Sequence, residues 1–310
     1  MKPLLKAAVL VLVIALITGC SQTGDTRNAN DADSSINGVN AFQIPVPTAP
    51  GVNVESKDKA TIDYSNNQDG YVIVQYNEIT DKALRVIVTA PHGESYHYSL
   101  GDGSIAEVIP LTEGDGEYEI GVYKHVEGSN YDTVLKIKVD VELEDKFAPF
   151  INPNQFVNFT KDSELVALAA ELTRNADTTD EKIAAIYEYV VKNFTYDYDL
   201  AATVKSGYLP NLDEVLEKKE GICFDYSALV TAMLRSQGIP ARLEIGYHGD
   251  QYHAWISKYC EDNGWIDNKY HYDGDEWTRM DPTEESTEHH AHTSRQQARD
   301  DDTYRLMYNY

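Results

Sequence analysis

The sequence predicts an α+β protein in which a small all-β domain precedes a domain that packs a helix on antiparallel strands. Three observations carry this prediction. Short alternating apolar runs, separated by glycine-containing turns, recur from residue 55 to 145. Apolar residues then recur at helical spacing from Phe224 to Gln237, where Gly238 and Pro240 end the pattern. Strand-like runs follow that helix, which is the order of elements expected when helices and antiparallel strands share one core.

The chain begins with the features of an export signal. A basic stretch over residues 1–6 precedes an apolar run over residues 7–17, which is too short to span a bilayer. The ending Thr18-Gly19-Cys20 resembles a lipobox, which implies cleavage before Cys20 and lipidation of its thiol in bacteria. We therefore expect a lipoprotein signal peptide over 1–19, rather than an uncleaved helix. The mature protein would be held outside the cytoplasmic membrane by acyl chains.

Two segments separate this signal from the second domain. Residues 20–54 are rich in Ser, Thr, Asn, Asp, Gly and Pro, and cannot bury enough apolar surface to fold, so we expect a disordered linker. Residues 55–145 predict a small immunoglobulin-like β-sandwich. Four of its runs are typical of strands: 71–76, 84–88, 117–123 and 135–141. Asp102 and Asp115 lie in glycine-rich turns that lack the ordered oxygen ligands of a calcium loop.

The second domain, residues 146–284, opens with a proline-containing hinge at 147–153. Helical spacing predicts one helix over 165–172 and another that begins with a capping box at Thr178 and Glu181. We expect both helices to belong to the core that supports the domain.

Cys223 lies in the first turn of the helix that ends near Gln237. The unpaired backbone N–H groups and the positive end of the helix dipole favour a thiolate there, and the thiolate is the nucleophilic form of cysteine. The alternative interpretation is a buried, inert cysteine.

His253 and Asp281 follow on strand-like segments. Residues 242–247 and 252–259 are typical of strands, and a third run over 276–281 ends before a proline. Cysteine, histidine and aspartate, each at the start or end of a regular element, are the parts needed for a nucleophile, its base and the group that orients the base.

These segments resemble the bacterial transglutaminase-like superfamily over about residues 160–284. The resemblance rests on four motifs: Gly221-Ile222-Cys223 with Asp225-Tyr226-Ser227-Ala228, Gly238-Ile239-Pro240-Ala241-Arg242, His253-Ala254-Trp255, and Gly264-Trp265 with Asp281-Pro282-Thr283. It implies a papain-like core in which Cys223 is the nucleophile, His253 the base and Asp281 the orienting carboxylate. Asp267 is a rival for the last role, but Asp281 carries the family flanks.

The resemblance also implies that the region before Cys223 helps to wall the cleft. Tyr196, Tyr198 and Tyr208 are therefore candidates for substrate contacts, with packing tyrosines as the alternative. No metal site and no cofactor is expected.

The end of the chain, residues 285–310, predicts a polar C-terminal tail, with a helix over 294–310 as the alternative. His289, His290 and His292 invite a metal interpretation, but no cysteine or fixed turn surrounds them, so we expect a solvated segment. Cys260 is interpreted as a small residue at the end of a strand, with a regulatory disulfide to Cys223 as the alternative.

The net charge of −25 over 310 residues argues against nucleic acid as a partner, because phosphate would be repelled. The charge suits basic or amine-bearing partners, but the alternative, that it serves the solubility of an exported protein, is preferred. We therefore expect a lipid-anchored enzyme that acts on protein or peptide amides through a thioester. An amine acceptor would give protein crosslinking, whereas water would give proteolysis or deamidation, and the sequence does not choose between them. The alternative is an inactive envelope scaffold whose β domain holds a partner. The oligomeric state is not indicated.

Overall fold

The computed structural model describes residues 42–259, 278–291 and 303–310. Within these residues no helix is both long enough and apolar enough to cross a membrane. The predicted signal peptide 1–19, with Cys20, lies outside the described residues, as do Cys260 and Asp267.

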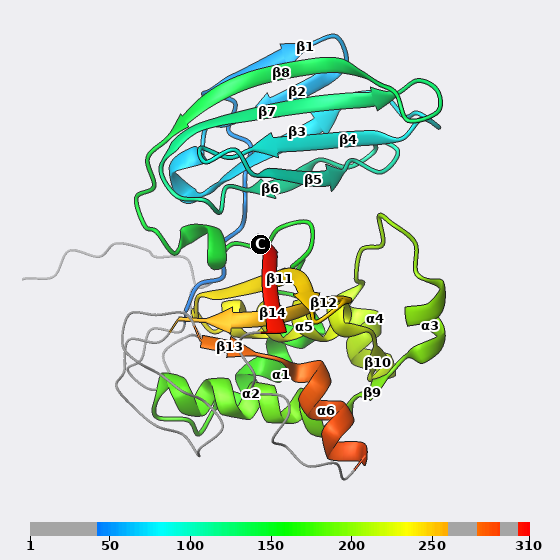
Figure 1. Cartoon of the computed structure of the whole chain (residues 1–310). Coiled ribbons are helices and arrows are strands. Elements are labelled where there is room, and N and C mark those ends of the chain that lie inside the picture. Colours follow the sequence, from blue (N-terminus) through cyan, green and yellow to red (C-terminus); the bar gives the residue numbers. More distant parts are fainter. Residues whose placement is uncertain (1–41, 260–277, 292–302) are drawn as a thin grey trace, which may run out of the picture. The chain divides into compact units, whose positions relative to one another are not determined.

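The first folded part is a sandwich of two antiparallel four-stranded sheets (Figure 1). One sheet has the order β1-β2-β3-β6 and the other β5-β4-β7-β8. Their bounds are β1 Val54–Lys57, β2 Ala60–Asp63, β3 Tyr71–Tyr76, β4 Leu84–Thr89, β5 Ser95–Ser99, β6 Glu107–Pro110, β7 Gly116–His125 and β8 Tyr131–Val141. The four predicted runs lie in β3, β4, β7 and β8, so the all-β interpretation of this region is confirmed.

Alternation along the strands builds the core of the sandwich. In β4, Leu84, Val86 and Val88 are buried, whereas the residues between them face outward. Because successive side chains of a strand point to opposite faces, one face of each sheet is apolar. These inner faces belong to one hydrophobic cluster.

The second folded part combines helices with a four-stranded antiparallel sheet of order β13-β12-β11-β14. The helices are α1 Glu164–Thr173, α2 Thr179–Asn193, α3 Tyr198–Thr203, α4 Leu212–Lys218, α5 Cys223–Ser236 and α6 Pro282–Ala291. The strands are β9 Thr195–Tyr196, β10 Glu220–Gly221, β11 Ala241–His248, β12 Gln251–Lys258, β13 Thr278–Met280 and β14 Tyr304–Asn309. The expected capping box is present, because Thr178 accepts from the Glu181 backbone and Glu181 accepts from Thr178.

Helix α5 is the centre of this part. Every residue from Asp225 to Ser236 is buried, and the helix packs on β11 and β12 (Figure 1). A helix buried on all sides is fixed by its neighbours along its whole length. The α+β class, with the cysteine helix on an antiparallel sheet, is therefore confirmed.

Arg235 anchors the far end of α5. Its guanidinium is fully buried and donates to the backbone carbonyls of Ala241, Asn152 and Tyr310 at 2.7 to 3.0 Å. Burial lowers the pKa of Arg235 to about 9, which leaves it charged at neutral pH. One side chain thus joins α5 to the hinge that precedes the domain and to the end of β14.

The C-terminal segment differs from the prediction of a polar tail or a helix over 294–310. Residues 304–309 form β14, which pairs antiparallel with β11, and residues 282–291 form α6. The edge of β11 that does not pair with β12 offers backbone hydrogen-bonding groups to β14. The tyrosines of β14 are typical of a half-buried strand. Tyr308 and Tyr310 also lie edge-on to Tyr96 of the sandwich.

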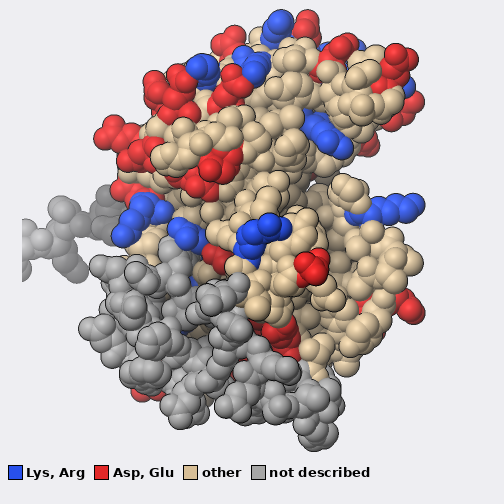
Figure 2. Space-filling view, in the orientation of Figure 1, with Lys and Arg blue, Asp and Glu red and all other residues tan. Residues whose placement is uncertain are grey.

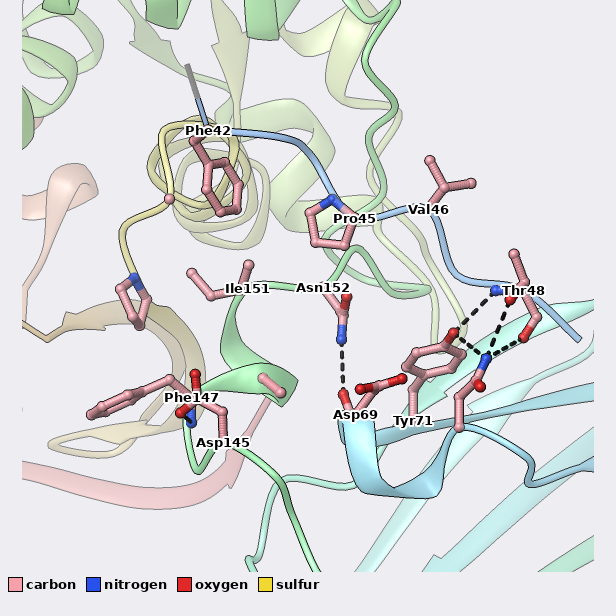
Figure 3. A pocket seen from close by; sticks show the side chains of 14 residues that line it. Phe42, Pro45, Val46, Thr48, Asp69, Tyr71, Asp145, Phe147, Ile151 and Asn152 are labelled. Atoms are coloured by element: carbon pink, nitrogen blue, oxygen red, sulfur yellow. Dashed lines mark hydrogen bonds between the residues drawn. The ribbon is translucent and has the colours of Figure 1, made fainter. Parts of the chain in front are cut away.

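A cavity of about 600 Å³ lies near the hinge, and its lining does not include Cys223. Figure 3 shows the chain from Phe42 to Thr48 along one side, with Tyr71 and Asn152 facing it. The expected linker is described only from residue 42 onward. There the ring of Phe42 packs against Gly238, whose φ of +76° and lack of a Cβ allow this close approach.

Candidate active site

Cys223 is the first residue of α5 and is half-buried. The turn before it is held by Asp225, whose Oδ2 accepts the backbone N–H of Ile222 at 2.8 Å. Oδ1 of the same carboxylate accepts the hydroxyl of Tyr208 at 2.8 Å. Burial raises the pKa of Asp225, and these two hydrogen bonds oppose the rise. The position of the cysteine is therefore set by a buried carboxylate on its own helix.

His253 lies on β12, opposite Gly246 of β11. Its Nε2 is 2.6 Å from Oδ2 of Asp281, and its side chain also forms a hydrogen bond with Cys223. Burial alone would lower the pKa of His253, but the hydrogen bonds with Asp281 and Cys223 outweigh it and raise the value to about 10. Because Nε2 is occupied by Asp281, Nδ1 is the ring nitrogen that remains for the sulfur.

Asp281 is buried at the start of α6, where it acts as the N-cap. Its Oδ1 accepts the backbone N–H groups of Thr283 and Glu284 at 3.1 and 3.0 Å. Its Oδ2 accepts from His253 and, at 2.8 Å, from the hydroxyl of Tyr304. Burial by itself would raise the pKa of Asp281, but the hydrogen bond and charge of His253, with the other donors, lower it. The carboxylate is thus ionised and fixed at both oxygens.

The three residues predicted from sequence therefore meet in space. His253 is hydrogen-bonded to both Asp281 and Cys223. His253 comes from β12, Asp281 from the start of α6 and Cys223 from the start of α5. This arrangement can pass a proton between a sulfur and a substrate while the carboxylate holds the ring.

The predicted tyrosines fall into two groups. Tyr196 lies on β9, next to β10 and the turn of Cys223, and its ring is edge-on to that of Tyr198 at 4.9 Å. Burial, followed by the nearby Cys223, raises the pKa of Tyr196 to about 12. The side chain of Tyr198 is 71% exposed, so its ring is open to a ligand. Tyr208 differs, because its hydroxyl is committed to Asp225.

Sequence reasoning missed two contributors to the site. Asp225 stands in the motif around Cys223 but received no role, since nothing in the spacing shows that its carboxylate bonds back to Ile222. Tyr304 lies beyond the motifs, on β14, and no local pattern indicates that it reaches Asp281.

A second histidine–carboxylate pair flanks this network. His248 Nδ1 lies 2.7 Å from Glu284 Oε1, and the His248 ring stacks on Tyr304 at 4.2 Å. Burial, with the charge of Asp281, raises the pKa of Glu284. Among the described residues, no group of three or more His, Cys, Asp or Glu side chains could hold a metal ion.

Comparisons with known proteins agree with the motifs over part of the chain. The uncharacterized protein YebA of Bacillus subtilis (strain 168) is 26% identical over 195 residues, which are 53% of this chain. The chain spans 25% of the length of that curated relative.

Two solved structures are also similar. A structure from Cytophaga hutchinsonii, named as a candidate cysteine protease, is 18% identical with a TM-score of 0.37 and covers 69% of this chain and 71% of its own. The periplasmic domain of TgpA from Pseudomonas aeruginosa is 14% identical with a TM-score of 0.34 and covers 74% of this chain and 96% of its own.

The family model of the transglutaminase-like superfamily matches residues 166–282. That range contains Cys223, His253 and Asp281 together with α5, β11 and β12. Residues 166–282 are therefore a domain of the transglutaminase-like superfamily.

Proposed function

We propose that this protein is a lipid-anchored, extracytoplasmic enzyme that cleaves or exchanges amide bonds of proteins or peptides through a thioester on Cys223. The observation that supports this proposal best is the position of His253, which is hydrogen-bonded both to Asp281, through Nε2, and to Cys223. In a catalytic triad the base likewise contacts the nucleophile and is oriented by a third group.

The charge state of His253 sets the first step. With a pKa of about 10, its imidazole is protonated at neutral pH and faces the sulfur as an imidazolium. When Cys223 attacks as its thiolate, this imidazolium is in place to donate a proton.

In the first half of the reaction the sulfur of Cys223 attacks the carbonyl carbon of the amide, and a C–S bond forms. The negative charge that develops on the carbonyl oxygen is stabilised by the backbone N–H of Cys223, at the positive end of α5. His253 gives its proton to the departing amine as the C–N bond breaks. The products of this half are the thioester and a free amine.

In the second half a water molecule or a primary amine attacks the thioester carbonyl. His253 removes a proton from the attacking group, the C–S bond breaks, and the thiolate and imidazolium are restored. Water gives hydrolysis, and an amine gives a new amide, which crosslinks two proteins when both reactants are protein side chains.

The surroundings of Cys223 support a protein or peptide as the substrate. The half-buried ring of Tyr196 lies near Cys223, and the exposed ring of Tyr198 is edge-on to it, so the two offer aromatic surface to a substrate. Acidic side chains gather over the sandwich on the face shown in Figure 2, and the chain as a whole carries a net charge of −25. This negative charge would attract basic or amine-bearing partners and repel nucleic acid. In this proposal lipidation at Cys20 holds the enzyme on the membrane.

The test is mass spectrometry of the purified protein incubated with a glutamine-rich protein and a labelled primary amine, beside the variant Cys223→Ala. Label incorporation that depends on Cys223 would establish acyl transfer to amines, and new peptide termini without label would establish proteolysis. If neither product forms under reducing conditions with several substrates, an envelope scaffold replaces the enzyme as the better explanation.

A further inference from the structure

Tyr304 donates its hydroxyl to the same carboxylate oxygen that accepts the proton of His253. The Tyr304 hydroxyl lies 2.8 Å from Asp281 Oδ2, and His253 Nε2 lies 2.6 Å from it. The backbone N–H groups of Thr283 and Glu284 occupy Oδ1. Oδ2 is therefore shared between the imidazole and one phenol.

The ring of Tyr304 is held in place independently of this hydrogen bond. Tyr304 is paired with His248 across β11 and β14, and the two rings stack at 4.2 Å and 10°. On another side the ring meets Trp255 edge-on at 5.1 Å. Trp255 is itself fixed, because its indole donates to Glu244 at 2.5 Å. The hydroxyl thus reaches Asp281 from a packed strand.

We propose that Tyr304 is a positioning residue for the His253–Asp281 pair, acting by fixing Oδ2 and by withdrawing charge from it. This inference rests on the proposed function of Cys223 and His253. A phenol that shares an oxygen with an imidazolium weakens that oxygen as a base, so the proton stays on His253 but is held less tightly. His253 can then give the proton to a leaving amine. Tyr304 lies beyond residues 166–282, so this contribution comes from β14.

Other ionisable groups face this network, so an experiment must distinguish their effects on the titration of His253 from the effect of Tyr304. Cys223 faces His253 from α5, and Glu284 of α6 pairs with His248 of β11. Glu244 of β11 is bonded to Trp255. A substitution that removes only the hydroxyl of Tyr304 leaves all of these side chains in place, although it also removes the hydrogen bond between that hydroxyl and Glu284.

The decisive experiment is a proton and nitrogen NMR titration of His253 in full-length protein, with Tyr304→Phe compared to wild type. The signal is assigned with His253→Gln. Phenylalanine keeps the ring contacts and removes the donor, so we expect the titration midpoint of His253 to rise. Site-specific replacement of Tyr304 by 3-fluorotyrosine makes the phenol a stronger donor, and the midpoint should then fall.

Tyr308→Phe is the matched control, because it removes one phenol from the same strand and should leave the titration of His253 unchanged. Thermal unfolding of each variant checks that the fold is kept. With any amide substrate that is turned over, kcat/KM of Tyr304→Phe should fall roughly tenfold, as expected for loss of a hydrogen bond to a charged group.

The NMR measurement needs no substrate, so it separates this inference from the proposed function. Opposite shifts in the two Tyr304 variants, absent in Tyr308→Phe, support the role of Tyr304 even if no amide is ever turned over. An unchanged midpoint in Tyr304→Phe, or an equal change in the control, overturns it, even if Cys223 proves essential for activity.

Discussion

Nε2 of His253 lies 2.6 Å from Oδ2 of Asp281, and both side chains are largely buried. Since that carboxylate is the largest influence that raises the pKa of His253, the neutral substitution Asp281→Asn should lower this pKa. We expect kcat/KM to fall roughly 10²- to 10⁴-fold, as for loss of an orienting carboxylate from a nucleophile–histidine pair. The measurement is kcat/KM across pH, with Asp213→Asn, an exposed aspartate on α4, as the control. Retention of wild-type activity by Asp281→Asn would exclude the proposed triad.

The same pair predicts how stability depends on pH. The pKa of His253 rises from 6.5 to about 10 in the folded state, so its stabilising contribution is complete below pH 6.5 and is lost as the pH rises through about 10. The pKa of Asp281 lies below 3.8, so its contribution is present above pH 3.8 and is lost as the pH falls through the lowered value.

Both contributions are therefore complete between pH 3.8 and 6.5. In that window we expect wild type to exceed His253→Gln by roughly 1 to 3 kcal/mol in free energy of unfolding. Urea unfolding of both proteins from pH 3 to 10.5 measures the difference. A difference that is largest at pH 10 would contradict this reading of the pair.

Tyr208 should act through Asp225 rather than through a substrate. Tyr208→Phe removes one of the two hydrogen bonds to this buried carboxylate, and we expect a loss of about 1 to 3 kcal/mol in the free energy of unfolding. Alkylation of Cys223 by iodoacetamide should slow as the turn before α5 loosens. Tyr189→Phe, which changes a half-buried tyrosine on α2, is the control and should have neither effect. If Tyr208→Phe alters only KM, the original expectation of substrate contact is the correct one.

Arg235 should be one of the most sensitive positions for stability. Arg235→Met leaves the carbonyls of Ala241, Asn152 and Tyr310 without this donor, and a loss on the order of 3 to 5 kcal/mol is expected from several buried acceptors. Arg174→Met, at an exposed arginine after α1, should change stability by less than about 0.5 kcal/mol. Equilibrium unfolding in urea compares the two, and similar values would show that the carbonyls find other donors.

The sequence predicted the elements that depend on local periodicity. The helical spacing after Cys223 and the capping box at Thr178 have local physical causes. The first is found in α5 and the second in α2. The pairing of β14 with β11 could not be predicted in this way, because the strand-like character of residues 304–309 does not identify a partner. Tyr208 shows the same limit, since its acceptor lies 17 residues away and is buried.

The architecture of the end of the chain affects when the site can form. Asn309 accepts a hydrogen bond from Thr112, 197 residues earlier, and Tyr304 and Tyr310 bond to Asp281 and Arg235. Contacts of such sequence separation form late in folding, because the intervening chain must first be ordered. During synthesis these residues also leave the ribosome after all the others of the site. A nascent chain that already contains Cys223 therefore lacks the strand that completes its surroundings until residues 304–310 have also left the ribosome.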